Sequence, residues 1–309
     1  MRDRRKIKFI GVGDELRMGT EVALFGPAGF PLKGPKGPGA FEYLAGMGLL
    51  SMEYQAVRSI RIGKRTAQGL GSAARDAGVV LTLHAPYAIN LCSRERPKRT
   101  ASIRRLYKGA VVGSQMGAVH ITFHPGYYGK LSREEAMDLQ LESLRRVRGM
   151  MDAKGIKVEL GPETTGKMSQ FGSLEEVLRL SEEIGGVRPT IDFGHLNVRG
   201  DLPRFKAADD YARVLDLVER RLGSEGIHDL VIHFSEVEPT KAGVGERRHH
   251  KIGSGFGPPF RPLANVLVER GYRAIVISES PLLELDAKKM KEEYDALRGS
   301  AVTGETTAP

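Results

Sequence analysis

The feature that most constrains the fold of this chain is an eightfold alternation of short β-branched runs with longer segments of helical spacing. The runs are KFIGVG (8–13), MEYQAV (52–57), VVLTLHAP (79–86), AVHITFHPG (118–126), KVELGPETT (157–165), PTIDFGHLN (189–197), DLVIHFSEV (229–237) and AIVISESP (274–281). Strands that are each followed by a helix are typical of a parallel barrel rather than an open sheet. We therefore predict an α/β fold, the (βα)8 TIM barrel.

Local signals define several helices. Ser173 and Glu176 form a capping box at the start of a helix that Gly185-Gly186 ends. Further helices are predicted at 99–116, 133–154, 205–222, 260–270 and 286–298. The stretch 25–39, FGPAGFPLKGPKGPG, is too rich in Gly and Pro for a regular element, so we expect a long loop after the first strand. A doubly wound sheet is the alternative fold, but GVGDELRMG does not match the G-x-G-x-x-G turn that usually follows its first strand.

The chain has no linker and no change of composition, which predicts one barrel domain over 1–299 and a disordered tail over 300–309. Hydrophobic residues make up 40% of the 309, enough to bury a large core, and this excludes a disordered chain. The lone Cys92 excludes a disulfide framework and a Cys-rich zinc finger, and we expect it to be a packed residue. No apolar run approaches the roughly 18 residues of a membrane helix, and MRDRRKIKF is not a signal peptide. We expect a cytoplasmic protein.

Side chains that bind metals recur where the predicted strands end. In a parallel barrel the active groups lie at the carboxyl ends of the strands, where the βα loops converge. One histidine there is more often structural, but a series on six strands is hard to explain in that way, and converging carboxylates need a cation between them. We predict a metal cluster from His84, His124, Glu163, Asp192, His195, His233 and Glu279, with His249 and His250 in the loop after the seventh strand.

Two other histidines have a structural explanation. His120 shares the strand parity of His124 but lies four residues earlier, near the bottom of the barrel, so we expect a packed core histidine. His228 precedes the seventh strand, on the opposite end of the barrel, and we expect it to be exposed.

These residues stand in motifs that resemble endonuclease IV. The motifs are, in chain order, HAPYAINL (84–91), FHPG (123–126), PETTGKMSQFGS (162–173), TIDFGHL (190–196), VIHFSE (231–236), RRHHKIGSG (247–255) and ISESP (277–281). Endonuclease IV, or AP endonuclease family 2, belongs to the xylose-isomerase-like TIM barrel superfamily, and this chain resembles its archaeal members. The family is zinc-dependent and cuts DNA at abasic sites.

The resemblance implies two or three Zn²⁺ ions held by His84, His124, Glu163, Asp192, His195, His233, His249 and Glu279. Glu163 would bridge two of the ions, and Glu279 would orient or deprotonate the attacking water, so that these two carboxylates are the expected catalytic groups. The implied reaction is hydrolysis of the phosphodiester 5′ to an abasic site by a metal-activated hydroxide, which leaves a 3′-hydroxyl.

The chain departs from the family pattern in two places. The family supplies a further ligand through D-x-H in the loop after the seventh strand, whereas here Arg247 stands in the aspartate position before His249. Glu246 lies one residue earlier and could substitute if the loop bends; otherwise the third metal would be weak or absent. The family's G-x-H-x-S start is not reproduced in GVGDE (11–15).

The implied partner is duplex DNA that contains abasic sites, bound by a monomer. The net charge of +9 favours an anionic partner. Basic residues follow the second, third and seventh predicted strands, where they could bind phosphates: Arg58, Arg61, Lys64 and Arg65; Arg94, Arg96, Lys98 and Arg99; Arg247, Arg248 and Lys251. Tyr87 matches the family's intercalating tyrosine, and Tyr127 and Tyr128 are further stacking candidates.

Two other functions remain open. A sugar isomerase or epimerase of the xylose-isomerase type shares the barrel and uses strand-end carboxylates and histidines, although its sites typically contain fewer histidines. A non-catalytic zinc protein that binds damaged DNA would result if Arg247 abolished one metal site.

Overall fold

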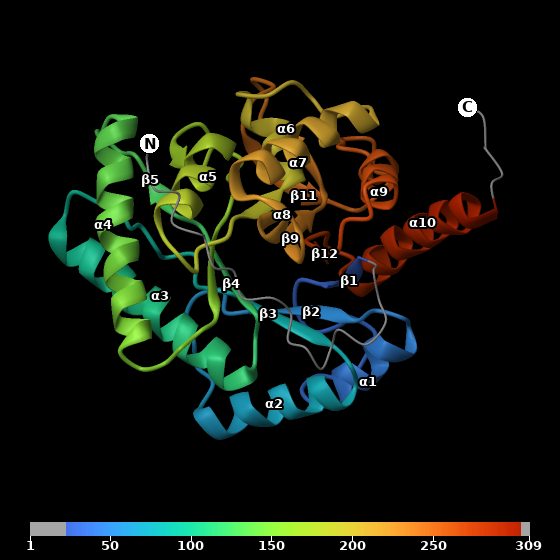
Figure 1. Cartoon of the computed structure of the whole chain (residues 1–309), viewed down its shortest axis with the longest axis horizontal. Coiled ribbons are helices and arrows are strands. Elements are labelled where there is room, and N and C mark those ends of the chain that lie inside the picture. Colours follow the sequence, from blue (N-terminus) through green and yellow to red (C-terminus); the bar gives the residue numbers. More distant parts are fainter. Residues whose placement is uncertain (1–22, 304–309) are drawn as a thin grey trace.

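The computed structural model describes residues 23–303, in which parallel strands form a closed barrel surrounded by helices (Figure 1). Two four-stranded sheets have the orders β1-β12-β9-β8 and β2-β3-β4-β6. Single parallel bridges join them, Ala28 to Glu53 on one side and Glu163 to Thr190 on the other, and so close the barrel. The barrel strands are β1 (Leu24–Pro27), β2 (Ser51–Gln55), β3 (Val80–His84), β4 (His120–Phe123), β6 (Glu159–Pro162), β8 (Thr190–Asp192), β9 (Leu230–Phe234) and β12 (Ala274–Ser278).

Every barrel strand is followed by at least one helix before the next barrel strand, so the predicted (βα)8 fold is confirmed. The helices are α1 (Gly39–Gly46), α2 (Lys64–Asp76), α3 (Arg96–Met116), α4 (Arg133–Asp152), α5 (Leu174–Glu183), α6 (Phe193–Arg199), α7 (Ala208–Leu222), α8 (Ser224–Ile227), α9 (Phe260–Glu269) and α10 (Glu284–Thr303). The capping box of Ser173 and Glu176 forms as predicted. Because α10 extends to Thr303, the beginning of the segment expected to be a disordered tail is helical; residues 304–309 lie outside the described residues.

The first strand of the barrel was predicted wrongly. The run 8–13 lies outside the described residues, and β1 lies partly in the stretch expected to be a loop. The segment LFGP pairs in parallel with β12, from Leu24 opposite Ile275 to Pro27 opposite Ser278. Gly26 is needed there because a Cβ atom would approach the carbonyl oxygen of Ser51 to 1.7 Å. Glycine therefore marks close strand packing at this position, not a loop.

The barrel interior is apolar on one side and polar on the other. Val80, Val231, Ile275 and Ile277 form a small buried cluster. On the polar side, the imidazole of His120 is buried and its Nε2 lies 2.9 Å from the hydroxyl of Thr190, so the prediction of a core histidine is confirmed. His228 is half-buried rather than exposed, because its loop packs under the barrel and its carbonyl accepts a hydrogen bond from Arg188.

Two small hairpin-like pairs lie over the carboxyl ends of the barrel strands. β5 (Gly126–Tyr127) pairs with β7 (Gln170–Phe171), and β10 (Glu236–Pro239) pairs with β11 (Glu246–His250), both antiparallel. Cys92 is buried beneath the first pair, where its thiol donates to the carbonyl of Tyr127, and this confirms a packed residue. Within residues 23–303 no helix combines the length and apolar character needed to cross a bilayer.

Candidate metal centre

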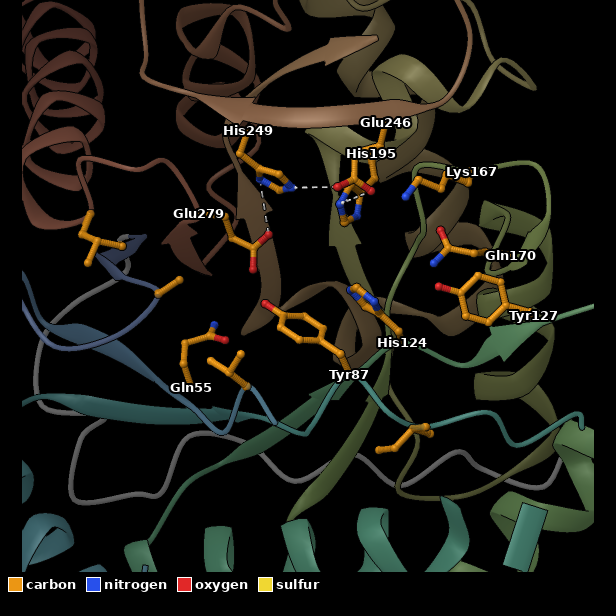
Figure 2. Close-up of a pocket in the computed structure, with 14 residues that line it drawn as sticks. Gln55, Tyr87, His124, Tyr127, Lys167, Gln170, His195, Glu246, His249 and Glu279 are labelled. Carbon is orange, nitrogen blue, oxygen red and sulfur yellow. Dashed lines mark ion pairs between the residues drawn. The ribbon is translucent and has the colours of Figure 1, made fainter. Parts of the chain in front are cut away.

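A cavity of about 560 Å³ opens at the carboxyl end of the barrel and collects the predicted metal ligands. Figure 2 shows His124 and Tyr87 entering it from the strand side and Glu246 and His249 from the β10–β11 hairpin, with Glu279 between them. The barrel topology explains the convergence, since residues that follow parallel strands are delivered to one end. The lining residues are Ala28, Gln55, Val57, Tyr87, Ile89, His124, Tyr127, Lys167, Gln170, His195, Glu246, His249, Glu279 and Leu283.

Glu163 is the centre of the cluster. Its side chain is fully buried, and its carboxylate lies 3.3 Å from Nε2 of His84, 2.9 Å from Nε2 of His124 and 3.1 Å from Nδ1 of His233. Burial would raise the pKa of the Glu163 carboxyl, but the imidazoles of His124 and His233 hold this pKa well below its usual range. Glu163 belongs to two of the groups whose ligand atoms lie within 4.8 Å of one another, as the position of a bridging carboxylate requires.

Asp192 and His195 come from the end of β8, where the chain turns directly into α6. The Oδ1 atom of Asp192 accepts a hydrogen bond from the backbone amide of His195 at 2.7 Å and so caps the helix. The Oδ2 atom is buried and has no hydrogen-bond partner among residues 23–303. Burial raises the pKa of the Asp192 carboxyl to about 6. A buried acceptor without a donor is a natural position for a cation.

Glu246 joins the cluster, although it occupies a different sequence position from the family aspartate. Its carboxylate lies 3.6 Å from Nε2 of His195 and 3.5 Å from Nε2 of His249. Its backbone amide donates to the carbonyl of Gly166, where a Cβ atom would approach the Glu246 side chain to 2.7 Å. The loop therefore bends as the substitution requires, and Arg247 points out of the pocket to an ion pair with Glu238.

Glu279 follows β12 and closes the cluster from the remaining side. Its carboxylate lies 3.3 Å from Nδ1 of His233 and 3.8 Å from Nδ1 of His249. Burial alone would raise the pKa of this carboxyl, but the His233 imidazole lowers it well below the usual range. The group is therefore ionised at neutral pH and faces the cavity.

One buried carboxylate of the site did not emerge from the sequence. Glu53, in the middle of β2, is fully buried, and its Oε2 atom lies 3.2 Å from Nε2 of His233. The signal was a charged residue inside the run MEYQAV, in phase with Gln55, which lines the cavity. Such a residue must face the barrel interior, because neighbouring side chains of a strand point to opposite faces.

The charges of the cluster fit several divalent cations. Five carboxylates, from Glu53, Glu163, Asp192, Glu246 and Glu279, meet five imidazoles, from His84, His124, His195, His233 and His249. Burial opposes a charge on His84, yet the hydrogen bond and charge of Glu163 raise the pKa of this imidazole to about 9. Positive charge is thus required here, and zinc is bound by these same nitrogen and oxygen donors. The identity and number of ions stay predictions.

The residues expected to bind DNA lie around the cavity but do not form one surface with it. Tyr87 is 47% exposed and its ring centroid is 5.3 Å from that of His84, while Tyr127 is 50% exposed on the opposite lip. Tyr128 instead donates to Glu176 and packs against Phe171. Arg61 lines a separate apolar hollow, and the remaining predicted phosphate ligands are exposed outside the cavity: Lys64, Arg65, Arg247 and Arg248. Lys167 is the cation that lines it.

Comparison with known proteins places the chain in a family. A model of the xylose isomerase-like TIM barrel family matches residues 41–299, and the chain belongs to this family. An uncharacterized protein of Methanocaldococcus jannaschii is 35% identical over 284 residues, which cover 91% of this chain and 100% of that protein. A probable endonuclease 4 of Acholeplasma laidlawii is 25% identical over 224 residues, which cover 69% of this chain and 73% of that protein.

Solved structures show the same barrel. Endonuclease IV from Thermus thermophilus has a TM-score of 0.64 or less, namely 0.62, at 19% identity, with 85% of this chain and 94% of that chain covered. A D-tagatose 3-epimerase-like protein has a TM-score of 0.64 at 22% identity, with 85% and 95% covered. The predicted relationship to endonuclease IV is confirmed, but the overall fold does not separate nucleases from sugar epimerases.

Proposed function

We propose that this protein is a zinc-dependent endonuclease that hydrolyses the phosphodiester 5′ to an abasic site in duplex DNA and leaves a 3′-hydroxyl. The observation that carries the proposal is the convergence of five imidazoles and five carboxylates on one cavity. A single divalent ion needs about three or four protein ligands, so this set is large enough for more than one ion. Sites for phosphodiester hydrolysis commonly use such paired ions.

Zinc bound there would supply Lewis acidity toward a phosphate group and toward water. The chain's own groups would do the rest. Glu279 is ionised and faces the cavity, so it would orient the attacking water or accept its proton. Tyr87 stands at the lip with half of its surface exposed and would fill the gap left when an abasic sugar turns out of the stack.

Cations around the cavity would hold the DNA backbone. Lys167 lines the cavity, and Arg65 and Lys64 begin α2, at the end of the barrel where the strands deliver the metal ligands. Arg247 and Arg248 lie exposed on β11 above the same end, although Arg247 would have to exchange Glu238 for a phosphate. Such contacts weaken steeply with salt, because each bound phosphate releases counterions.

A duplex carrying one tetrahydrofuran abasic analogue tests the proposal. The zinc-loaded protein should cut 5′ to the analogue, leave the undamaged duplex intact and lose activity in excess chelator. Glu279→Gln should bind the duplex with unchanged affinity but cut it at least about 100-fold more slowly, as expected for loss of a group that handles a proton. Epimerisation of D-tagatose by the zinc-loaded protein without DNA cleavage would instead establish a sugar epimerase, and binding without cleavage would establish a damage-binding protein.

A further inference from the structure

The histidines of the cluster are each held through one ring nitrogen while the other nitrogen faces the carboxylates. Nδ1 of His84 donates to the carbonyl of Ala85 at 2.8 Å, and Nδ1 of His195 donates to the carbonyl of Thr164 at 2.9 Å. In each ring this leaves Nε2 directed to the cluster. A partner on one nitrogen fixes which nitrogen carries the proton and which can bind a metal.

His233 is held in the opposite sense. Its Nδ1 atom faces the cluster, 3.1 Å from Glu163 and 3.3 Å from Glu279, and its Nε2 atom lies 3.2 Å from Oε2 of Glu53. We infer that Glu53 is a positioning residue, whose carboxylate accepts the Nε2 proton of His233 and so presents Nδ1 to a metal held with Glu163 and Glu279. The inference rests on the metal-binding part of the proposed function, not on the choice of DNA as substrate.

The surroundings of Glu53 determine its role as an acceptor. The hydroxyls of Thr82 and Thr122 donate to its Oε2 atom at 3.2 and 3.0 Å, and the amide of Gln55 donates to its Oε1 atom at 2.9 Å. Glu53 is fully buried one layer below the cavity, since its Cα partner in β3 is Thr82, two residues before His84. A carboxylate with donors on both oxygens has only acceptor capacity left for the imidazole.

The arrangement also argues against Glu53 as a ligand of the same ion. The imidazole of His233 stands between Glu53 on its Nε2 side and Glu163 with Glu279 on its Nδ1 side. A metal ligated by Nδ1 is therefore separated from Glu53 by the ring. Glu53 and the other two carboxylates instead form a carboxylate–histidine–metal chain, in which the outer carboxylate raises the basicity of the imidazole.

The test measures zinc binding and the protonation of His233, not cleavage. In the zinc-loaded protein labelled with ¹⁵N-histidine, two-bond ¹⁵N–¹H correlation spectra should show the His233 proton on Nε2. A proton on Nδ1, with Nε2 bound to zinc, would overturn the inference without any variant. In competition with a chelator, Glu53→Leu should bind zinc roughly 10–100-fold more weakly, which is the usual cost of losing such an outer partner.

Two further variants separate positioning from packing. Glu53→Gln keeps an acceptor for the Nε2 proton, so it should recover most of the zinc affinity that Glu53→Leu loses. Glu159→Gln changes a carboxylate that is equally buried in the barrel interior but pairs with Arg188 and not with the cluster, so its zinc affinity should equal that of the unmodified protein. Equal zinc affinity in Glu53→Leu and the unmodified protein, or an equal loss in Glu159→Gln, would refute the role of Glu53. Absence of zinc binding by the unmodified protein would refute the proposed function instead.

Discussion

Glu246 and Arg247 are neighbours in the chain but serve opposite environments. The antiparallel strand β11 turns successive side chains to opposite faces, so Glu246 faces His195 and His249 while Arg247 faces outward to Glu238. The replacement of the family aspartate by arginine thus leaves a carboxylate in the site. At the scale of single residues, strand parity decides which of two adjacent charges belongs to the metal centre.

This geometry predicts that Glu246→Ala lowers the zinc content. The variant leaves His195 and His249 without the carboxylate between them, and a zinc site needs about three protein ligands. We expect elemental analysis after dialysis to show about one ion per chain fewer than in the unmodified protein. Arg247→Ala is the matched control and should retain the full content. Unchanged zinc in Glu246→Ala would show that Glu246 is not a ligand.

Helix α5 is held at its start by a buried carboxylate that also ties two other elements together. Glu176 accepts hydrogen bonds from the backbone amides of Gly172 and Ser173 and from the hydroxyl of Tyr128. Arg133, at the start of α4, forms an ion pair with it at 3.2 Å. Burial would raise the pKa of Glu176, but these donors lower it below its ordinary value of 4.5.

Glu176→Gln should therefore destabilise the protein in a pH-dependent way. At pH 7 we expect the free energy of unfolding to fall by roughly 1–3 kcal/mol, the cost of impairing a buried hydrogen-bonded group. A depressed pKa stabilises the folded state above pH 4.5 and loses this effect as the pH falls through the folded-state pKa. Urea denaturation should thus show a difference from the unmodified protein that shrinks below pH 4.5.

The capping box of α4 provides the control for this prediction. Glu135 makes the same contacts with Ser132, but its carboxylate is exposed to water. Glu135→Gln should destabilise the protein less than Glu176→Gln does, because water replaces the lost hydrogen bonds. An equal effect of the two substitutions would contradict the importance of burial at Glu176.

The whole molecule is organised so that seven elements meet at one charged centre. Ligand candidates come from β3, β4, β6, β8, β9 and β12 and from the β10–β11 hairpin. Without a cation, their buried carboxylates are neutralised only by protonated imidazoles. Metal binding therefore joins strands from both halves of the barrel.

Removal of the metal should lower the melting temperature of the entire domain. At free zinc a thousandfold above the dissociation constant, each site adds about 4 kcal/mol to the free energy of unfolding. We expect calorimetry to show a lower melting temperature after chelation and full recovery when zinc is returned, whereas magnesium, which favours all-oxygen sites, should not restore it. Identical melting of the chelated and zinc-loaded proteins would contradict a metal centre that links the strands.

The sequence alone was sufficient for the barrel and for the ligands at the strand ends. Alternating runs and helical spacing are local patterns, and parallel topology carries the residue after each strand, such as His84 or Glu279, to the same end. The resemblance to endonuclease IV added the order of the ligands.

Only the tertiary structure decided the features that depend on distant neighbours. Gly26 lies in a strand because the carbonyl of Ser51 passes too close for a side chain, and Glu246 reaches the cavity because Gly166 allows its approach. Glu53 faces His233 across 180 residues of sequence. Such contacts are made by closure of the barrel, which brings together segments whose local patterns contain no record of one another.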